Sequence, residues 1–587
     1  METDHQQQAF ISDGPNLTPT DVARIARSPR HPDTGAAMLT MGISQEALRR
    51  VQRSRAVVDE IVRRGEVVYG ITTGFGGFKD RVISPEDSAR LQVNLILSQC
   101  VGVGPVLPTE VVRAMMVCRA HTLSLGYSGI RWQTLQLLYD MLNAGVHPLV
   151  PEQGSVGASG DLAPLSHMAL VMIGRGEAEW RGRVMPAVEA LRGAGLEPVV
   201  LGPKEGLALS NGTSLMSGLL SLAATDAALL CETADVVGAM SLEALQGIPD
   251  AFDPRIHAAR GQRGQIVSAA RIRQFTHGST LMCTDHRRPG TNCVDRVQDA
   301  YSLRCMPQVH GPVRDAVDYV HHVLVAELNG ANDNPLIFGA DDAELSADAD
   351  AGAFAGAGAN TDSASAKTAA LNLNPGPPSN LRLNVLSGGN FHGAPLSVAA
   401  DFLGMAVCQL ATISERRQAR LVDPSAHGGL FPAFLIENGG LNSGFMMVQY
   451  TSAALASENK SLAHPASVDT IPTSANVEDH VSMGPVAARH CRAIVANTVR
   501  VLALEAMMAA QALDFRLRAN PTAKMGAGTR AAYELVRQRV PFLERDRDLQ
   551  PYIAAVVELV ESGQLAGVAS SSASDLPVAQ QLPLKPN

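Results

Sequence analysis

The chain has 587 residues, of which 46% are hydrophobic, 18% charged and 4% aromatic. This apolar content suffices for a large buried core and excludes global disorder. The 48 basic and 57 acidic residues give a net charge of −9. This net negative charge argues against a basic nucleic-acid-binding protein. The low aromatic content argues against a protein that binds nucleic acid by stacking on its bases. The low charged fraction indicates that much surface is buried in a large core or between subunits.

The cysteines and the N-terminus indicate the compartment. Eight cysteines are scattered along the chain without a CxxC pair, a pattern that predicts reduced thiols and neither a disulfide framework nor a zinc site. The first residues, METDHQQQAF, lack the apolar segment of a signal peptide, and no run of 18 apolar residues occurs. We therefore expect a soluble cytoplasmic protein.

The first 212 residues divide into an extension and a loop-rich domain. Residues 1–44 are polar and contain prolines, and we expect a loosely attached N-terminal extension with a helix start at Thr18. Helical spacing of apolar residues follows between about 45 and 68. Two glycine-rich loops, over residues 69–77 and 154–160, cannot be regular helix. Residues 45–212 are therefore assigned to a smaller, loop-rich α/β domain.

Long apolar segments dominate the remainder. Segments over 213–247, 399–421 and between Pro485 and Pro521 are rich in Ala, Val, Leu and Met, and we expect a break near Gly238 in the first. They predict a central long-helix bundle over 213–339 and 381–530. Residues 340–380 form a low-complexity insertion, and residues 531–587 a C-terminal helical segment with a disordered tail after Gly567. The predicted fold class is mainly α.

Several familiar sites are absent from the sequence. Neither glycine loop completes a nucleotide-binding GxGxxG or GxxxxGK[ST] pattern, and no HExxH metal motif or GxSxG nucleophile motif occurs. The histidines also lack the spacing of metal ligands. We expect neither a metal nor a nucleotide cofactor.

One loop carries a more specific signal. Residues 154–166 read GSVGASGDLAPLS and resemble the signature of the aromatic amino acid ammonia-lyases, which comprise histidine, phenylalanine and tyrosine ammonia-lyases and related aminomutases. Matching blocks follow one order between residues 45 and 520: YGITTGFG (69–76), LALSNGT (207–213), QDAYSLRC (298–305), SGGNFHG (387–393), ASENK (456–460) and NVEDHVSM (476–483).

The resemblance implies the fold of that family, a homotetramer with shared active sites, and a cofactor made from the chain itself. Ala158, Ser159 and Gly160 would cyclise and dehydrate to 4-methylideneimidazol-5-one (MIO), an electrophile that no encoded side chain supplies. Small residues permit the tight bend that this closure needs. The MIO loop then belongs to the N-terminal domain.

The implied reaction eliminates ammonia from an L-aromatic amino acid to give a trans-α,β-unsaturated acid. Tyr69 matches the family's catalytic base, and its pKa would have to be lowered for work at neutral pH. Tyr301 matches a tyrosine near the MIO, and Arg304 the arginine that holds the substrate carboxylate. Other matches are Asn211 and Gln298 for the MIO oxygen or polar substrate groups, Phe391 beside the MIO, and Glu458 near the amine or ring.

The substrate is left open. The pair that sets ring selectivity in the family aligns with Ser98 and Gln99, which fit neither the Ser-His of histidine lyases nor the Phe-Leu of phenylalanine lyases. Gln99 could bond a ring oxygen, so a tyrosine- or phenylalanine-type substrate is favoured, with histidine as the alternative. A 2,3-aminomutase and an inactive helical scaffold are further alternatives.

Overall fold

The computed structural model describes residues 8–29, 37–78, 80–284, 297–338 and 384–571. Residues 340–380 and the tail beyond Ser571 lie outside this range, so the expectations for them remain predictions. The chain forms two compact units. The first comprises Met1–Ser221, Leu324–Ser397 and Ser467–Pro485, and the second Leu222–Val323, Val398–Ala466 and Val486–Asn587.

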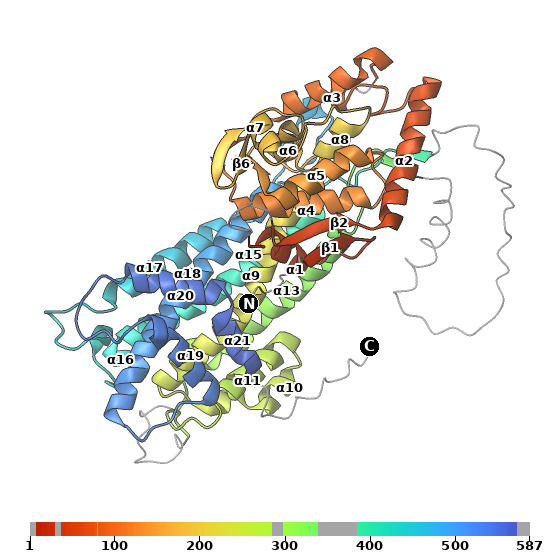
Figure 1. Cartoon of the computed structure of the whole chain (residues 1–587). Helices are drawn as coiled ribbons and strands as arrows, with labels where there is room; N and C mark the ends of the chain where they lie inside the picture. The colour runs from red at the N-terminus through yellow and green to blue at the C-terminus, as the bar shows by residue number, and fades with distance from the viewer. Residues whose placement is uncertain (1–7, 30–36, 79, 285–296, 339–383, 572–587) are drawn as a thin grey trace, which may run out of the picture. The chain divides into compact units, whose positions relative to one another are not determined.

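The first unit combines short helices with small sheets (Figure 1). Strands β1 and β2 pair in parallel, whereas β3–β5, β4–β6–β7 and β8–β9 pair antiparallel. Helix α6 packs against both α3 and α8. The elements are β1 (Gln8–Ser12), α1 (Pro19–Ala26), β2 (Leu39–Ile43), α2 (Gln45–Arg64), η1 (Gly76–Phe78), α3 (Pro85–Gln99), β3 (Val103–Val106), α4 (Thr109–Ser124), α5 (Trp132–Ala144), β4 (Val146–Pro148), β5 (Pro151–Gln153), α6 (Leu162–Met172), β6 (Glu177–Trp180), β7 (Arg183–Pro186), α7 (Ala187–Gly193), α8 (Glu205–Ser210), β8 (Leu336–Ile337), β9 (Val385–Leu386) and η6 (Ser474–Asn476).

The N-terminal segment is integrated into this unit, which corrects the expectation of a loose attachment. Helix α1 does begin at Thr18, whose side chain forms a reciprocal capping box with Asp21. Leu17, Val22 and Ile25 are fully buried, and β1 pairs with β2 along its whole length. Buried apolar side chains therefore hold the segment in place.

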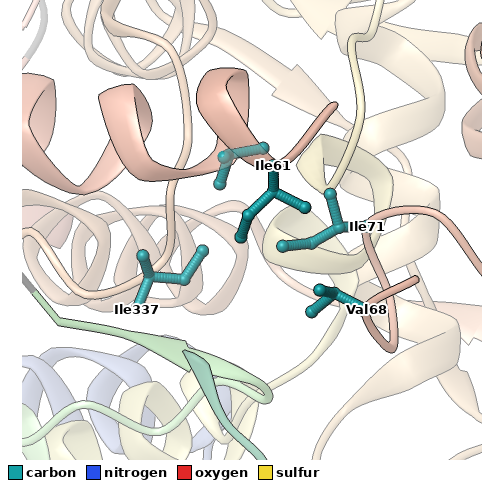
Figure 2. Packing of buried hydrophobic residues seen from close by; sticks show 5 residues of the cluster. Ile61, Val68, Ile71 and Ile337 are labelled. Carbon is teal, nitrogen blue, oxygen red and sulfur yellow. The ribbon is translucent and has the colours of Figure 1, made fainter. Parts of the chain in front are cut away.

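A hydrophobic cluster fixes the turn that carries Tyr69. Val58 and Ile61 lie on one face of α2, three residues apart, and contact Val68, Ile71 and Ile337. Figure 2 shows Ile61, Val68 and Ile71 pointing toward one another, with Ile337 of β8 beside them. Burial of each such side chain contributes about 1.5–3 kcal/mol. The residues on both sides of Tyr69 are thus anchored to α2 and β8.

The second unit consists of helices (Figure 1). The long helices are α9 (Ser214–Ala244), α13 (Met306–Leu328), α15 (Ala394–Val422) and α18 (Gly484–Ala519). Each of them has one end among the residues of the first unit. The 36 residues of α18 span about 54 Å. The shorter elements are η2 (Pro249–Phe252), α10 (Pro254–Arg260), α11 (Arg263–Phe275), α12 (Tyr301–Arg304), α16 (Pro424–His427), η5 (Ala433–Leu435), α17 (Met446–Leu462), α19 (Ala527–Arg539), α20 (Gln550–Glu561) and α21 (Gln564–Ser571).

The mainly α fold with long helices is confirmed, with two corrections in detail. Helix α9 continues through Gly238 without the expected break. A Cβ at Gly238 would lie 2.6 Å from the sulfur of Met306, so close packing overrides the low helix propensity of glycine. Helix α21 continues to Ser571, past Gly567, where the tail was expected to begin.

By length and composition, α9, α15 and α18 could each cross a membrane, and 78%, 67% and 83% of their most apolar windows are buried inside the protein. They also carry buried charges. Arg417 of α15 pairs with Glu505 of α18 at 2.5 Å, with both side chains fully buried. The apolar faces of these helices thus serve a protein core.

The thiols differ from expectation at one position. Cys283 is disulfide-bonded, whereas the free cysteines among the described residues are Cys100, Cys118, Cys231, Cys305, Cys408 and Cys491. Reduced thiols were expected throughout. The expectation is wrong at Cys283 because the spacing of cysteines in the sequence does not reveal which sulfur atoms meet in the fold.

Candidate active site

The Ala158–Ser159–Gly160 loop lies directly before α6 in a tight bend of the backbone. Gly160 is buried with φ +74°, and a Cβ there would lie 2.1 Å from the carbonyl oxygen of Gly212. The Asp161 N–H donates to the same oxygen at 2.7 Å. Only glycine fits this close approach.

Two side chains hold Ser159. The Asn211 amide donates to the Ser159 carbonyl oxygen at 3.0 Å, and the Ser159 hydroxyl donates to Glu478 Oε1 at 2.7 Å. The hydroxyl that MIO formation would remove is therefore already bound to a carboxylate, and the loop has no bulk at Gly160. These residues fit the MIO group.

Glu478 is the residue that sequence reasoning missed. Its second oxygen accepts from the Thr473 hydroxyl at 2.7 Å, and the Thr473 and Glu478 backbones bond each other at 2.9 and 3.3 Å. The carboxylate is therefore held in one orientation. Glu478 lies inside the matching block 476–483, so the sequence did contain a signal that could have identified it. Glu458, chosen instead, is exposed on α17 in the second unit.

Tyr69 is half-buried in the turn after α2. Burial raises its pKa above the usual value, a hydrogen bond from the Gly76 backbone acts in the opposite direction, and the negative charges of Glu478 and Asp333 raise it further. The lowered pKa expected from the sequence is therefore wrong for this chain in isolation, because burial and two carboxylates outweigh one hydrogen bond.

Asp161 ties the loop to the first turn of α9. Its Oδ2 accepts from the Leu215 and Met216 N–H groups at 2.8 and 3.1 Å. Burial raises the pKa of Asp161 to about 7, although these two bonds and Arg119 lower it. The carboxylate thus supplies acceptors for backbone groups that a helix N-terminus leaves free.

The candidate selectivity residues end α3. Ser98 is exposed and donates to the Leu95 carbonyl at 2.9 Å. Gln99 is half-buried, and its Oε1 accepts from the Ser166 hydroxyl of α6 at 3.1 Å. With the amide oxygen engaged, the NH₂ group of Gln99 is the part left to donate.

A cavity of about 410 Å³ opens in the first unit. Asn332 lines it and also lies against Gly212, the neighbour of Gly160. Phe391 is half-buried next to His392, whose ring bonds the His480 carbonyl at 3.1 Å. The other lining residues are Ala326, Glu327, Gly330, Ala331, Gly389, Asn390 and Pro395.

The other predicted residues belong to the second unit. Gln298, Tyr301 and Glu458 are exposed there. The Arg304 guanidinium lies 4.5 Å from the Tyr301 ring centre, and its Nε donates to the Asp299 carbonyl at 2.9 Å. The structure thus brings Ser159, Asn211 and Glu478 together in the first unit and pairs Tyr301 with Arg304 in the second. Within the described ranges, no group of three or more His, Cys, Asp or Glu residues could hold a metal ion.

Known proteins resemble this chain over nearly its full length. Histidine ammonia-lyases from Chloroflexus aurantiacus and Caldanaerobacter subterraneus subsp. tengcongensis are each 48% identical, covering 96% and 95% of this chain and 98% and 97% of their own. Among solved structures, histidine ammonia-lyase from Trypanosoma cruzi matches with TM-score 0.80 at 38% identity, covering 96% of both chains. Tyrosine aminomutase from Streptomyces globisporus matches with TM-score 0.82 at 33% identity, covering 97% of this chain and 99% of that one.

A family model described as aromatic amino acid lyase matches residues 17–538. The chain therefore belongs to the aromatic amino acid lyase family and is a carbon–nitrogen lyase.

Proposed function

We propose that this protein is a histidine ammonia-lyase that converts L-histidine into trans-urocanate and ammonia. The observation that carries the proposal is the 48% identity over 96% of the chain to a histidine ammonia-lyase. The tyrosine aminomutase is less similar, at 33%. Histidine thus replaces the tyrosine- or phenylalanine-type substrate that the Ser98–Gln99 pair favoured.

The cofactor is proposed to be MIO formed from Ala158, Ser159 and Gly160, with no metal or nucleotide. Once formed, this group supplies an electrophilic carbon that turns the substrate's amine into a better leaving group. The bend at Gly160 and the contacts of Ser159 support the assignment. Closure removes the Ser159 hydroxyl, so Glu478 loses that donor and becomes available to the substrate's ammonium group.

Tyr69 is the proposed base. As a phenolate it takes the proton from Cβ, the Cβ–H electrons form the Cα–Cβ double bond, and the Cα–N bond breaks. The residues on both sides of Tyr69 are anchored in the hydrophobic cluster. This anchoring supports a fixed position of the phenol oxygen during catalysis. The hydrogen bond from Gly76 favours the phenolate.

Ring recognition is assigned to Gln99. Its NH₂ group, with Oε1 held by Ser166, suits an acceptor such as the unprotonated nitrogen of a neutral imidazole. A phenol oxygen would also accept, which explains why the sequence alone favoured tyrosine. Ser98 and Phe391 would complete the walls around the ring.

Arg304, Tyr301, Gln298 and Glu458 are assigned by resemblance to the carboxylate and amine of the substrate. The Tyr301 side chain is 71% exposed in the single chain, which supports a homotetramer whose sites use residues of several subunits. Mixing inactive Tyr69→Phe and Arg304→Met proteins under conditions of subunit exchange should then restore part of the activity. No recovery in tetramers shown to be mixed would contradict shared sites.

A 2,3-aminomutase is the second candidate, favoured by the match to tyrosine aminomutase. It would use the same residues but return ammonia to Cβ.

The deciding experiment incubates the purified protein with L-histidine, L-tyrosine and L-phenylalanine in parallel, with a Ser159→Ala variant as the blank. We expect ultraviolet absorbance of urocanate to rise fastest, and no β-amino acid by chromatography. Coumarate or cinnamate forming faster would refute the substrate, and a β-amino acid product would favour the aminomutase. No product at all, without the mass change of MIO formation, would favour an inactive scaffold.

A further inference from the structure

A fully buried ion pair lies in the first unit. Lys204 Nζ contacts Asp333 Oδ2 at 2.7 Å, and both side chains have no solvent exposure. The two residues are separated by 129 positions. Lys204 directly precedes α8, and Asp333 lies shortly before β8. Removing two charges from water is costly, and a hydrophobic pair of similar volume would often stabilise the fold as well. The pair therefore invites a functional explanation.

The Tyr69 turn is wedged between the two segments that carry this pair. A Cβ at Gly70, the residue after Tyr69, would lie 2.9 Å from Leu207 Cδ2 and 3.1 Å from Pro335 Cδ. Leu207 follows Lys204 in the chain, and Pro335 follows Asp333. Because Val68 and Ile71 are locked into the cluster of Figure 2, the turn is held against both segments.

The charges that act on Tyr69 are negative, and buried cations oppose one of them. Asp333 and Glu478 both act against the phenolate. Lys204 opposes Asp333, and Arg119, also fully buried, interacts with Asp333 and Asp161. Other charged groups on neighbouring elements already have partners: Arg55 with Asp59, Arg131 with Glu205, Arg64 with Glu66, and Glu327 with Thr213 and Asn332.

We propose that Lys204 and Asp333 are positioning residues for catalysis, with Lys204 cancelling the Asp333 charge so that Tyr69 can lose its proton and act as the base. This inference rests on the proposed role of Tyr69. If Lys204 becomes neutral, the Asp333 charge is left uncompensated beside the phenol and disfavours the phenolate. If Asp333 becomes neutral, Lys204 favours the phenolate.

The test compares Lys204→Met, Asp333→Asn and the double variant, each checked by peptide mass for MIO formation. Because the base works deprotonated, kcat/KM rises as pH rises through the pKa of Tyr69. We expect Lys204→Met to move this midpoint upward by about one pH unit, Asp333→Asn to move it downward, and the double variant to lie near wild type. Opposite shifts would not follow from a merely structural role.

A second readout does not depend on turnover. The tyrosinate absorbance of each variant is titrated and compared with the same variant carrying Tyr69→Phe, so that the difference reports Tyr69 alone. The same opposite shifts are expected. Arg417→Met breaks another fully buried ion pair, one that is not among the charges acting on Tyr69, and should lower stability with an unchanged midpoint.

Unchanged midpoints in folded, MIO-containing Lys204→Met and Asp333→Asn proteins would overturn the inference. If Lys204→Met fails to fold, the test uses Lys204→Arg, which keeps the positive charge, and Asp333→Asn, which removes the negative charge. Only Asp333→Asn should then shift the pH midpoint. Full activity of Tyr69→Phe would instead refute the proposed base itself, which separates the two failures.

Discussion

The Ser159 hydroxyl donates to the Glu478 carboxylate at 2.7 Å although the two residues are 319 positions apart. Thr473 holds the other carboxylate oxygen. The family's tripeptide and an acidic side chain from the block 476–483 are thus parts of one site. A fixed carboxylate beside the loop can hold a cationic amine in place, and a charge-assisted hydrogen bond of this kind is stronger than a neutral one.

We therefore predict that Glu478→Gln lowers kcat/KM for histidine by about a hundredfold, because the substrate's ammonium loses a charged partner. Steady-state kinetics at several pH values measure the loss. Asp479→Asn is the matched control, since Asp479 is the adjacent carboxylate and is exposed. Equal losses in both variants would mean that net charge, and not the position of Glu478, matters.

The same assay compares Glu478 with Glu458, the carboxylate that the resemblance implied. Glu458→Gln should lose as much activity as Glu478→Gln if both carboxylates bind the substrate in an assembled site. A small effect at Glu458 beside a large one at Glu478 would assign the amine-binding role to Glu478 alone.

Ser159→Ala should abolish activity while leaving the fold intact. The wild-type peptide that contains residues 158–160 should be lighter than its encoded mass by two water molecules, and the variant peptide should have its encoded mass. Because closure already removes the Ser159 hydroxyl from the wild-type protein, the variant loses no further bond to Glu478, and the free energy of unfolding should change by no more than about 1 kcal/mol. An unmodified peptide in active wild-type protein would contradict the MIO assignment.

Ser166→Ala should weaken ring recognition through Gln99. Without the Ser166 hydroxyl, the Gln99 amide loses its orientation, and a lost hydrogen bond of about 1 kcal/mol corresponds to roughly a fivefold rise in KM for histidine with kcat little changed. The control is Ser124→Ala, which removes another buried serine hydroxyl, bonded to the His121 carbonyl.

The neighbouring substitution Gln99→His should raise the preference for histidine over tyrosine. Unchanged selectivity of both Gln99→His and Ser166→Ala would show that this pair does not read the ring.

Glu243 should make stability depend on pH. Burial raises its pKa from 4.5 to about 7, although the Gly526 N–H and the Thr529 hydroxyl donate to it. Because the folded-state pKa is raised, the protonated form favours the fold. This contribution is complete below about pH 4.5 and is lost as pH rises through about 7.

Glu243→Gln should therefore flatten the fall in thermal unfolding temperature across this range, with an effect of up to about 3 kcal/mol on the alkaline side. Thermal unfolding of both proteins at matched pH values measures it. A parallel pH dependence in the two proteins would show that another buried acid is responsible.

The sequence alone predicted the chemistry-bearing loop and the long helices. Ala158, Ser159 and Gly160 are consecutive and lie inside the signature over residues 154–166, so the local sequence is enough for the resemblance to imply cyclisation. Helices such as α18 are predictable because apolar residues repeat at the helical period and no proline interrupts them. The family resemblance was also visible in the sequence, because it rests on short blocks of consecutive residues that follow one order along the chain.

Only the tertiary structure decided which side chains meet. The contact of Glu478 with Ser159 and the pairing of Lys204 with Asp333 both join residues that are far apart in the chain. The pKa of Tyr69 belongs to the same class: its direction follows from burial and from charges far away in the chain. Periodicity and motifs report short-range order, whereas desolvation and Coulomb forces act through space, and so they become known only when the fold is known.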